Sequence, residues 1–475
     1  MNLILNLISF VGIFGLCFVA WLGSEDRKAL PIKVILWGVG LQLAIGLLVF
    51  QLPLTRELIV QMGNLFNALI DAADAGSRFL FGELIVPKFG QSVGPGAAGR
   101  WITRALQNPY VAVPGDRLGK DFIDLGYIFA FRALPQVIFF SAIVGLLYRL
   151  GFIQPVVKLF AAIFQRTLGI SGAESLSGAA NIFVGIESAI AVKPFLADMT
   201  RSELCAILAS CFGSIASTVL GLYASYLRGT FPNITAHMMS ASILTIPACF
   251  VMAKILVPEK GEPKTLGTIP EEKEDDTKEK PSPMDSLIVG ALDGVNMATG
   301  IAAVLIAIIA LVALLNNMFG SLAGLSANPF FPVRAIGNLF SIITLNNIFG
   351  VLFLPLTVLT GVSLDPHEIW QASVLIGQRV LQTSIPPYIE LAKLNSEQLI
   401  SDRTMLIVSY VLCGFAHIPS YGIFVGGLSN LVPSRRSEIS SLGWKSLWAA
   451  TLATLMTGCI AGIFFFGDSA SILGR

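Results

Sequence analysis

Long apolar stretches alternate with short polar ones along the chain, and this pattern predicts a bundle of membrane-spanning helices. A helix needs roughly 20 consecutive apolar residues to cross about 30 Å of hydrocarbon. Six runs reach that length, at residues 3–22, 34–52, 127–148, 237–257, 287–315 and 447–466. Two further runs, 204–226 and 405–428, are long enough but carry Gly, Ser or Pro near the middle. We therefore expect about eight transmembrane helices, two of them broken.

The segment that precedes each broken helix is too polar to cross the membrane as a single helix. Residues 174–196 are interrupted by Asn181 and by Gly185-Ile-Glu-Ser188, and residues 372–391 by Thr383-Ser-Ile-Pro-Pro387. Each segment is typical of a re-entrant hairpin, because non-helical backbone at membrane depth needs protein or a water-filled cavity beside it. The order of hairpin and broken helix occurs twice, and a different number of spans leads into each copy. The pattern predicts an all-α membrane protein built from inverted repeats.

The remaining stretches divide the chain into four parts. Residues 1–125 contain the first spans, a long loop, and an amphipathic segment at 54–80 that we expect to lie in the membrane interface. Two transport halves follow, at 126–257 and 285–475. Between them, residues 258–284 mix Glu, Asp and Lys with prolines, a composition that predicts a solvated linker.

Lys and Arg gather in three short loops. Arg27 and Lys28 follow the first span, a Lys-rich stretch follows Val257, and Arg435 and Arg436 precede the last span. Short loops rich in Lys and Arg lie on the cytoplasmic side. We expect these three loops to share that face, both termini to lie outside the cytoplasm, and the chain to be a multi-pass protein of the plasma (inner) membrane.

Composition excludes several classes of protein. Hydrophobic residues make up 54% of the chain and charged residues 13%, with a mean hydropathy of +0.75, so most of the chain is solvated by lipid. A net charge of +1 provides no basic field for nucleic acid. The six cysteines lie in apolar runs without C-x-x-C spacing, which favours buried thiols over disulfides or zinc. No H-E-x-x-H or P-loop motif occurs, so we do not expect an enzyme.

Polar residues at the interruptions are the candidates for a site. Asn181 and Ser214 offer neutral oxygens beside unwound backbone, which suits a small cation such as sodium, although helix-to-helix hydrogen bonds would also explain them. A carboxylate inside a hairpin, such as Glu187, is usually functional unless it lies at the aqueous mouth. His417 is followed by Pro419, which frees backbone carbonyls, but a lone histidine is ordinarily structural.

Several motifs occur in the order and spacing of a known family. They are Gly172-Ala-Glu-Ser-Leu-Ser177, Asn181-Ile-Phe-Val-Gly185, Val192-Lys-Pro-Phe-Leu196, Met199-Thr-Arg-Ser-Glu-Leu204, Cys413-Gly-Phe-Ala416, Gly426-Gly-Leu428 and Pro433-Ser-Arg-Arg436. From residue 130 to its end the chain resembles the concentrative nucleoside transporters. The resemblance implies a homotrimer whose protomers each hold one small solute near the membrane midplane and import it with a sodium gradient, without any other cofactor.

The resemblance also assigns residues. It implies sodium ligands at the side chains of Asn181 and Ser214 and the carbonyls of Val184 and Ile215. The corresponding solute-binding positions are Ile186, Glu187, Ser188, Thr383, Ser384, His417 and Ser420.

At the solute-binding positions this chain departs from the family pattern. The typical Gly-Gln-Thr-Glu, Asn-Glu and Asn-Phe-Gly-Ser are replaced by Gly185-Ile-Glu-Ser188, Thr383-Ser384 and His417-Ile-Pro-Ser420. A site that hydrogen-bonds its solute rejects analogues that leave its polar groups unpaired, so we expect a changed solute preference. Alternatives are a proton-coupled carrier in which Glu187 and His417 titrate, a carrier of a different solute, and a transporter-derived sensor.

Overall fold

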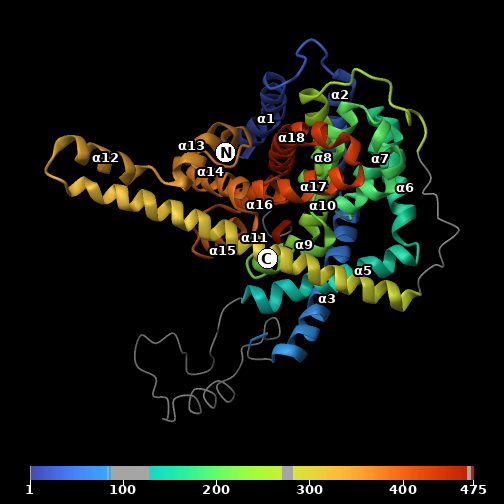
Figure 1. Ribbon diagram of the computed structural model, residues 1–475, viewed down its shortest axis with the longest axis horizontal. Helices are drawn as coiled ribbons and strands as arrows, with labels where there is room; N and C mark the ends of the chain where they lie inside the picture. The colour runs from blue at the N-terminus through green and yellow to red at the C-terminus, as the bar shows by residue number, and fades with distance from the viewer. Residues whose placement is uncertain are drawn as a thin grey trace.

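The computed structural model describes residues 2–82, 85–86, 128–183, 185–269, 282–467 and 472–474, and within them all regular structure is helical (Figure 1). The first part of the chain forms α1 (Asn2–Leu22), α2 (Ile32–Phe50), α3 (Pro53–Phe81), α5 (Phe129–Arg149), α6 (Ile153–Leu168), α7 (Gly172–Ala180), η1 (Ile186–Asp198), α8 (Arg201–Gly213), α9 (Ser217–Leu227) and α10 (Ile234–Leu256). The second part forms α11 (Pro283–Ala323), η2 (Gly324–Ala327), α12 (Phe331–Ile342), α13 (Leu345–Leu359), α14 (Pro366–Leu381), α15 (Ile385–Ser396), α16 (Asp402–Leu412), α17 (Ile418–Leu431), η3 (Pro433–Arg435) and α18 (Arg436–Ile463).

Among the described residues, six single helices are long and apolar enough to cross a membrane: α1, α2, α5, α10, α11 and α18. They coincide with the six uninterrupted runs predicted from hydropathy. A further candidate span, the pair α12 and α13, is bent by 60° and was not predicted. Arg334, Asn346 and Asn347 lower the apolar content of that stretch, so hydropathy alone does not mark it.

Both hairpins and both broken helices are present. In the first half, α7 and η1 form hairpin one, and α8 and α9 form a helix broken at 214–216. In the second half, α14 and α15 form hairpin two, and α16 and α17 are separated by 413–417. The predicted start of hairpin two was too late, because its first helix begins at Pro366, where Asp365 caps the helix by accepting from the His367 N–H.

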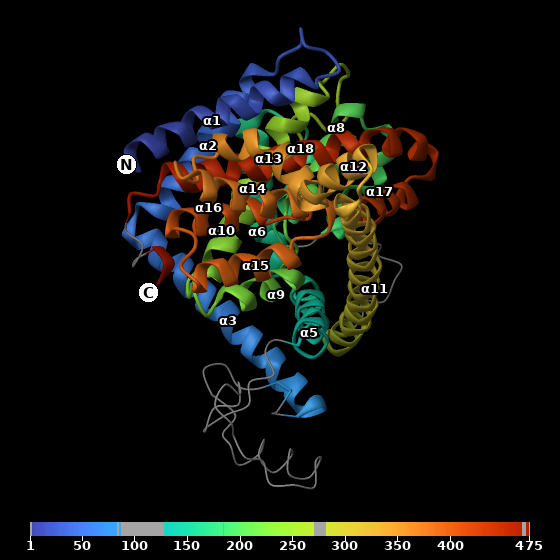
Figure 2. The ribbon, with the colours of Figure 1, turned by 90° about the vertical axis from the view of Figure 1, so that its left-hand side faces the viewer.

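The two hairpins enter the bundle from opposite faces. The base of hairpin one lies beside the loop after α1, since Arg201, which follows the hairpin, bonds Glu25 at 2.8 Å. Lys445 also reaches Glu25, at 2.6 Å, and Lys260 reaches Asp26, at 3.0 Å, so the three basic loops share one face as predicted. The base of hairpin two lies at the other face, where Arg403 bonds Asn6 and the Phe465 carbonyl. Figure 2 shows both chain ends toward the same side of the bundle.

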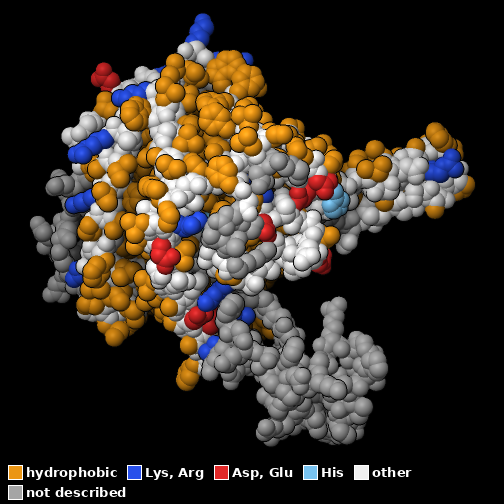
Figure 3. All heavy atoms as spheres, turned by 180° about the vertical axis from the view of Figure 1, so that it is seen from behind, with side chains coloured by type: hydrophobic (Ala, Val, Ile, Leu, Met, Phe, Trp, Pro, Cys, Tyr) orange, Lys and Arg blue, Asp and Glu red, His pale blue; other side chains and the backbone are white. Residues whose placement is uncertain are grey.

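Burial separates a packed centre from a projecting arm. In the most apolar 18-residue stretch of α10 and of α18, 89% is buried inside the structure, whereas in α11 the share is 17%. Helix α11 packs along α5, where Gly294 allows close contact because a Cβ there would lie 2.7 Å from the Ile138 Cα. Beyond α5 it leaves the bundle, and η2 and α12 fold back on it to form the arm seen in Figures 1 and 3.

Helix α3 has nearly the bounds predicted for the amphipathic segment. Some of its polar residues contact other helices, while Glu57, Gln61 and Asn64 are exposed. Asp74 pairs with Arg132 of α5 at 3.0 Å, and Asn67 accepts a hydrogen bond from Thr235 of α10 at 2.6 Å. Helix α3 therefore packs on α5 and α10, and its position at the membrane interface stays a prediction.

Candidate functional site

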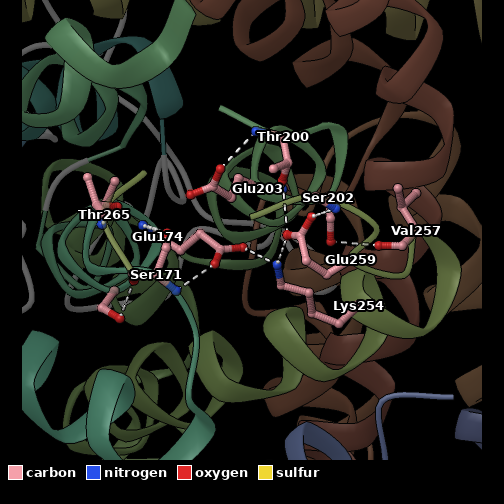
Figure 4. A network of polar contacts seen from close by, with 12 residues as sticks. Ser171, Glu174, Thr200, Ser202, Glu203, Lys254, Val257, Glu259 and Thr265 are labelled. Carbon is pink, nitrogen blue, oxygen red and sulfur yellow. Dashed lines mark hydrogen bonds and ion pairs between the residues drawn. The ribbon is translucent and has the colours of Figure 1, made fainter. Parts of the chain in front are cut away.

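A buried ion pair fixes the base of hairpin one (Figure 4). Glu174 caps α7 together with Ser171, whose N–H donates to one carboxylate oxygen at 2.9 Å. The other oxygen lies 2.6 Å from Nζ of Lys254 in α10, and both side chains are buried. Nζ also lies 3.1 Å from Glu259, at the start of the linker. The entry of the hairpin is thus held by charge to α10 and to the segment that follows it.

The linker also contacts this base directly. The carbonyl and hydroxyl oxygens of Thr265 accept from the N–H groups of Gly172 and Ala173, at 2.9 and 3.1 Å. These N–H groups at the start of α7 have no partner within the helix. The described linker residues, 258–269, are therefore packed on hairpin one, while 270–281 lie outside the described residues.

The tip of hairpin one meets the first helix break. The Phe183 carbonyl accepts from the Ser217 N–H at 3.1 Å, which joins the tip to the start of α9. Asn181 is fully buried and its amide donates to the Ser210 hydroxyl at 2.9 Å. At the break, the Ser214 hydroxyl is buried and has no hydrogen-bond partner among the described residues. Ile215 is also buried, and Val184 lies outside the described residues.

The tip of hairpin two meets the second break in a similar way. The Ser384 hydroxyl donates to the Gly414 carbonyl at 3.1 Å. Gly414 has a φ of +132°, which side chains rarely allow, and a Cβ there would collide with the Gly213 carbonyl oxygen. Both the backbone conformation and the close contact therefore require glycine. Because Gly213 ends α8 and Gly414 follows α16, the two broken helices touch at their breaks.

His417 caps the second half of its broken helix. Its Nδ1 accepts from the Ser420 N–H at 3.2 Å and lies 2.8 Å from the Ser420 hydroxyl. A ring nitrogen that accepts from a backbone N–H must carry a lone pair, so this His417 is a neutral imidazole. Both residues are buried, and Pro419 in the first turn of α17 suits a position that needs no backbone donor.

The other predicted solute-binding residues lie near the same tips. Thr383 accepts from the Ile385 N–H at 3.3 Å, and the buried Ser188 hydroxyl lies 3.4 Å from that of Ser177. Ile186 and Glu187 are in η1, but their side chains lie outside the described part of the structure. The element that holds them packs against α17, which begins beside His417.

Sequence reasoning missed Arg379. It lies on α14 one turn before the tip of hairpin two, is fully buried, and donates from Nη1 to the Thr454 hydroxyl at 2.8 Å and to the Val411 carbonyl at 2.5 Å. The rule that ionisable residues inside membrane segments are usually functional was applied to Glu187. Applied to residues 372–391, the same rule would have identified Arg379.

Together these elements define a class of protein. Two hairpins entering from opposite faces, two broken helices that touch at their breaks, and a lining of neutral oxygens are the arrangement of a secondary transporter. The buried, unpartnered Ser214 hydroxyl beside unwound backbone has the chemistry of a ligand for a hard cation. The residues present therefore fit a sodium ion as a transported species.

Comparison with known proteins identifies the family. The models for the N-terminus and C-terminus of the Na⁺-dependent nucleoside transporters match residues 11–84 and 237–462, and a nucleoside recognition (gate) model matches 130–229. The chain belongs to the concentrative, Na⁺-dependent nucleoside transporter family, and it is a transport protein and not an enzyme.

Individual relatives match this chain over nearly its whole length. An uncharacterized transporter of Haemophilus influenzae is 32% identical, over 98% of this chain and 99% of its own. Human solute carrier family 28 member 3 is 31% identical over 96% of this chain, which spans 60% of that longer protein. A solved structure of CNTnw in an inward-facing substrate-bound state covers 98% of both chains at 31% identity, with a TM-score of 0.78.

Proposed function

We propose that this chain is a sodium-coupled symporter that carries a nucleoside or a nucleoside-like solute into the cell. The observation that supports it most is the meeting of four non-helical segments, two tips and two breaks, in the buried centre of the bundle. Backbone of this kind is tolerated in a membrane only where protein buries it or where it lines a cavity, and in secondary transporters such segments form the solute and ion sites, so the meeting point is where a solute and an ion would bind. The family's description supplies sodium and nucleoside as the pair.

Sodium would bind between the tip of hairpin one and the first break. Its proposed ligands are the side-chain oxygens of Asn181 and Ser214 and the carbonyl oxygens of Val184 and Ile215. The Ser214 hydroxyl, which has no partner among the described residues, supports this assignment. A buried hydroxyl without a hydrogen-bond partner destabilises the fold until a ligand binds to it.

The solute would bind among Ile186, Glu187, Ser188, Thr383, Ser384, His417 and Ser420. Ser384 bonds the Gly414 carbonyl and Ser420 bonds His417, so each hydroxyl can accept a hydrogen bond from a solute as it stands but can donate one only after these contacts break. Movement of hairpin two away from the second break would free the Ser384 hydroxyl to donate.

We further propose a membrane placement and an assembly. The face that contains Arg27, Lys260 and Lys445 would lie in the cytoplasm, with both termini on the other side of the plasma (inner) membrane. The arm leaves apolar side chains such as Ile306 and Leu311 uncovered by this chain, which suits burial against lipid and against the other subunits of a homotrimer.

Uptake by the purified protein in proteoliposomes tests the proposal. Radiolabelled uridine and inosine should accumulate with an inward sodium gradient at equal pH on both sides, and should not accumulate when choline replaces sodium. Accumulation driven by a pH gradient without sodium would show proton coupling instead. Binding of a nucleoside without counterflow would show a sensor, and would overturn the proposal.

A further inference from the structure

Arg379 is a buried cation that the described residues leave half unpaired. Nη1 is bonded to Thr454 and Val411, but among the described residues Nε and Nη2 have no hydrogen-bond partner and no carboxylate pairs with the guanidinium. Arginine cannot become neutral in a protein, so burial without a counter-charge costs several kcal/mol. A group in this condition needs a partner that the described residues do not supply.

A second buried arginine shows how this fold satisfies such a group when the role is structural. Arg403, at the start of α16, donates from Nε to the Gly361 carbonyl, from Nη1 to Asn6, and from Nη2 to Ser9, at 2.7, 2.6 and 3.0 Å. All three nitrogens of Arg403 are bonded. The difference between these two arginines lies entirely in the Nε and Nη2 edge.

That edge is the one with which arginine binds carboxylates. In this chain Arg201 directs Nε and Nη2 at Glu25, and Arg435 directs the same two nitrogens at Glu438. Two parallel N–H groups match the two oxygens of a planar carboxylate, and such bidentate bonds are among the strongest in proteins. The free edge of Arg379 therefore has the shape and charge to hold a carboxylate.

Arg379 lies close to the proposed solute site. Arg379 belongs to the same hairpin as Ser384, and its partner Val411 is two residues before the second break. Its charge acts on His417 across the break and on Tyr223 and Tyr388 beside it. None of these three groups supplies a carboxylate, and a bound anion would give Arg379 a counter-charge.

We propose that Arg379 is a solute-binding residue and that the preferred solute is a nucleoside-like molecule with a carboxylate. When hairpin two moves off the second break, the Nε and Nη2 edge receives the carboxylate, while Ser384 and Ser420 become free to bind the rest of the solute. The inference rests on the proposed function, because it names the solute class of the same site. Co-transport of one sodium ion with one monoanion would move no net charge.

The test compares orotidine, which is uridine with a carboxylate on its ring, with uridine itself. Sodium-driven uptake is measured in proteoliposomes for the wild type, for Arg379→Lys, which keeps the charge but loses the paired edge, and for the control Arg403→Lys. We expect orotidine to be preferred over uridine by at least tenfold. Arg379→Lys should lower orotidine uptake on the order of 10- to 100-fold at low concentration, the loss expected for a charged bidentate bond. The ratio of the two solutes should not change in Arg403→Lys.

The outcomes separate this inference from the function on which it rests. Sodium-driven uptake of uridine without any preference for orotidine would overturn the role of Arg379 and leave the symporter standing. Absence of sodium-driven uptake for nucleosides and for orotidine would overturn the proposed function itself. If Arg379→Lys does not assemble, the preference of the wild type for orotidine still decides the matter. A second measurement on the wild type is the response of uptake to a potassium diffusion potential, and this response should be weak for orotidine.

Discussion

Replacing Lys254 by Met isolates the ion pair at the base of hairpin one. Methionine has a similar length and volume, so the substitution removes charge with little change in packing. Glu174, whose side chain is fully buried, is then left with hydrogen bonds from the start of its own helix but without a counter-charge. Breaking one partner of a buried pair costs about 3–5 kcal/mol, which is the loss of stability expected here.

This cost can be converted into a change in melting temperature. The entropy of unfolding is about 2.1 cal/mol/K per residue, or roughly 1 kcal/mol/K for a chain of 475 residues. The midpoint of thermal unfolding of purified Lys254→Met in detergent should therefore fall by about 3–5 °C. The matched control is Lys260→Met, which removes an exposed pair with Asp26 and should change the midpoint by less than about 1 °C.

A double variant completes the test. Lys254→Met combined with Glu174→Gln leaves no buried charge in the pair, so most of the lost stability should return. An unchanged melting midpoint in Lys254→Met would refute the reasoning, because it would mean that Glu174 is not ionised or not isolated from water. Failure of the double variant to recover would show that the lysine stabilises the hairpin through packing and not through charge.

Three further perturbations test other parts of the structure. Ser214→Ala should raise the sodium concentration that gives half-maximal uptake by about tenfold, because one oxygen of the proposed cation shell is lost; a sodium titration of uptake measures this. His417→Ala should cost about 1 kcal/mol by removing the cap of α17, while His417→Asn, also a good cap, should retain the melting midpoint. Arg201 and, less strongly, Lys445 lower the pKa of Glu25 from 4.5 to about 2. Its contribution to stability is therefore full above pH 4.5 and is lost as the pH falls toward 2, and melting curves of Glu25→Gln should lack that part of the acid dependence.

Much of the fold could be predicted because lipid leaves few solutions. An apolar run of sufficient length must be a helix, and a polar interruption at membrane depth must meet protein or water. These two rules identify the spans, the two hairpins and the two broken helices. They do not identify α6 or α12, which are short or amphipathic, and they do not show that the polar stripe of α3 would bind Arg132 and Thr235. Such partners are set by tertiary packing and not by local composition.

The charged residues inside the bundle show where sequence reasoning ends. A sequence states that a buried charge must be compensated, but it does not state by what. The structure gives three different answers. Glu174 compensates Lys254, neutral oxygens surround Arg403, and no described residue bonds to Nε or Nη2 of Arg379. The first two are closed arrangements and explain stability. The third is open, and this open arrangement is the observation behind the proposal that the solute carries the carboxylate that pairs with Arg379.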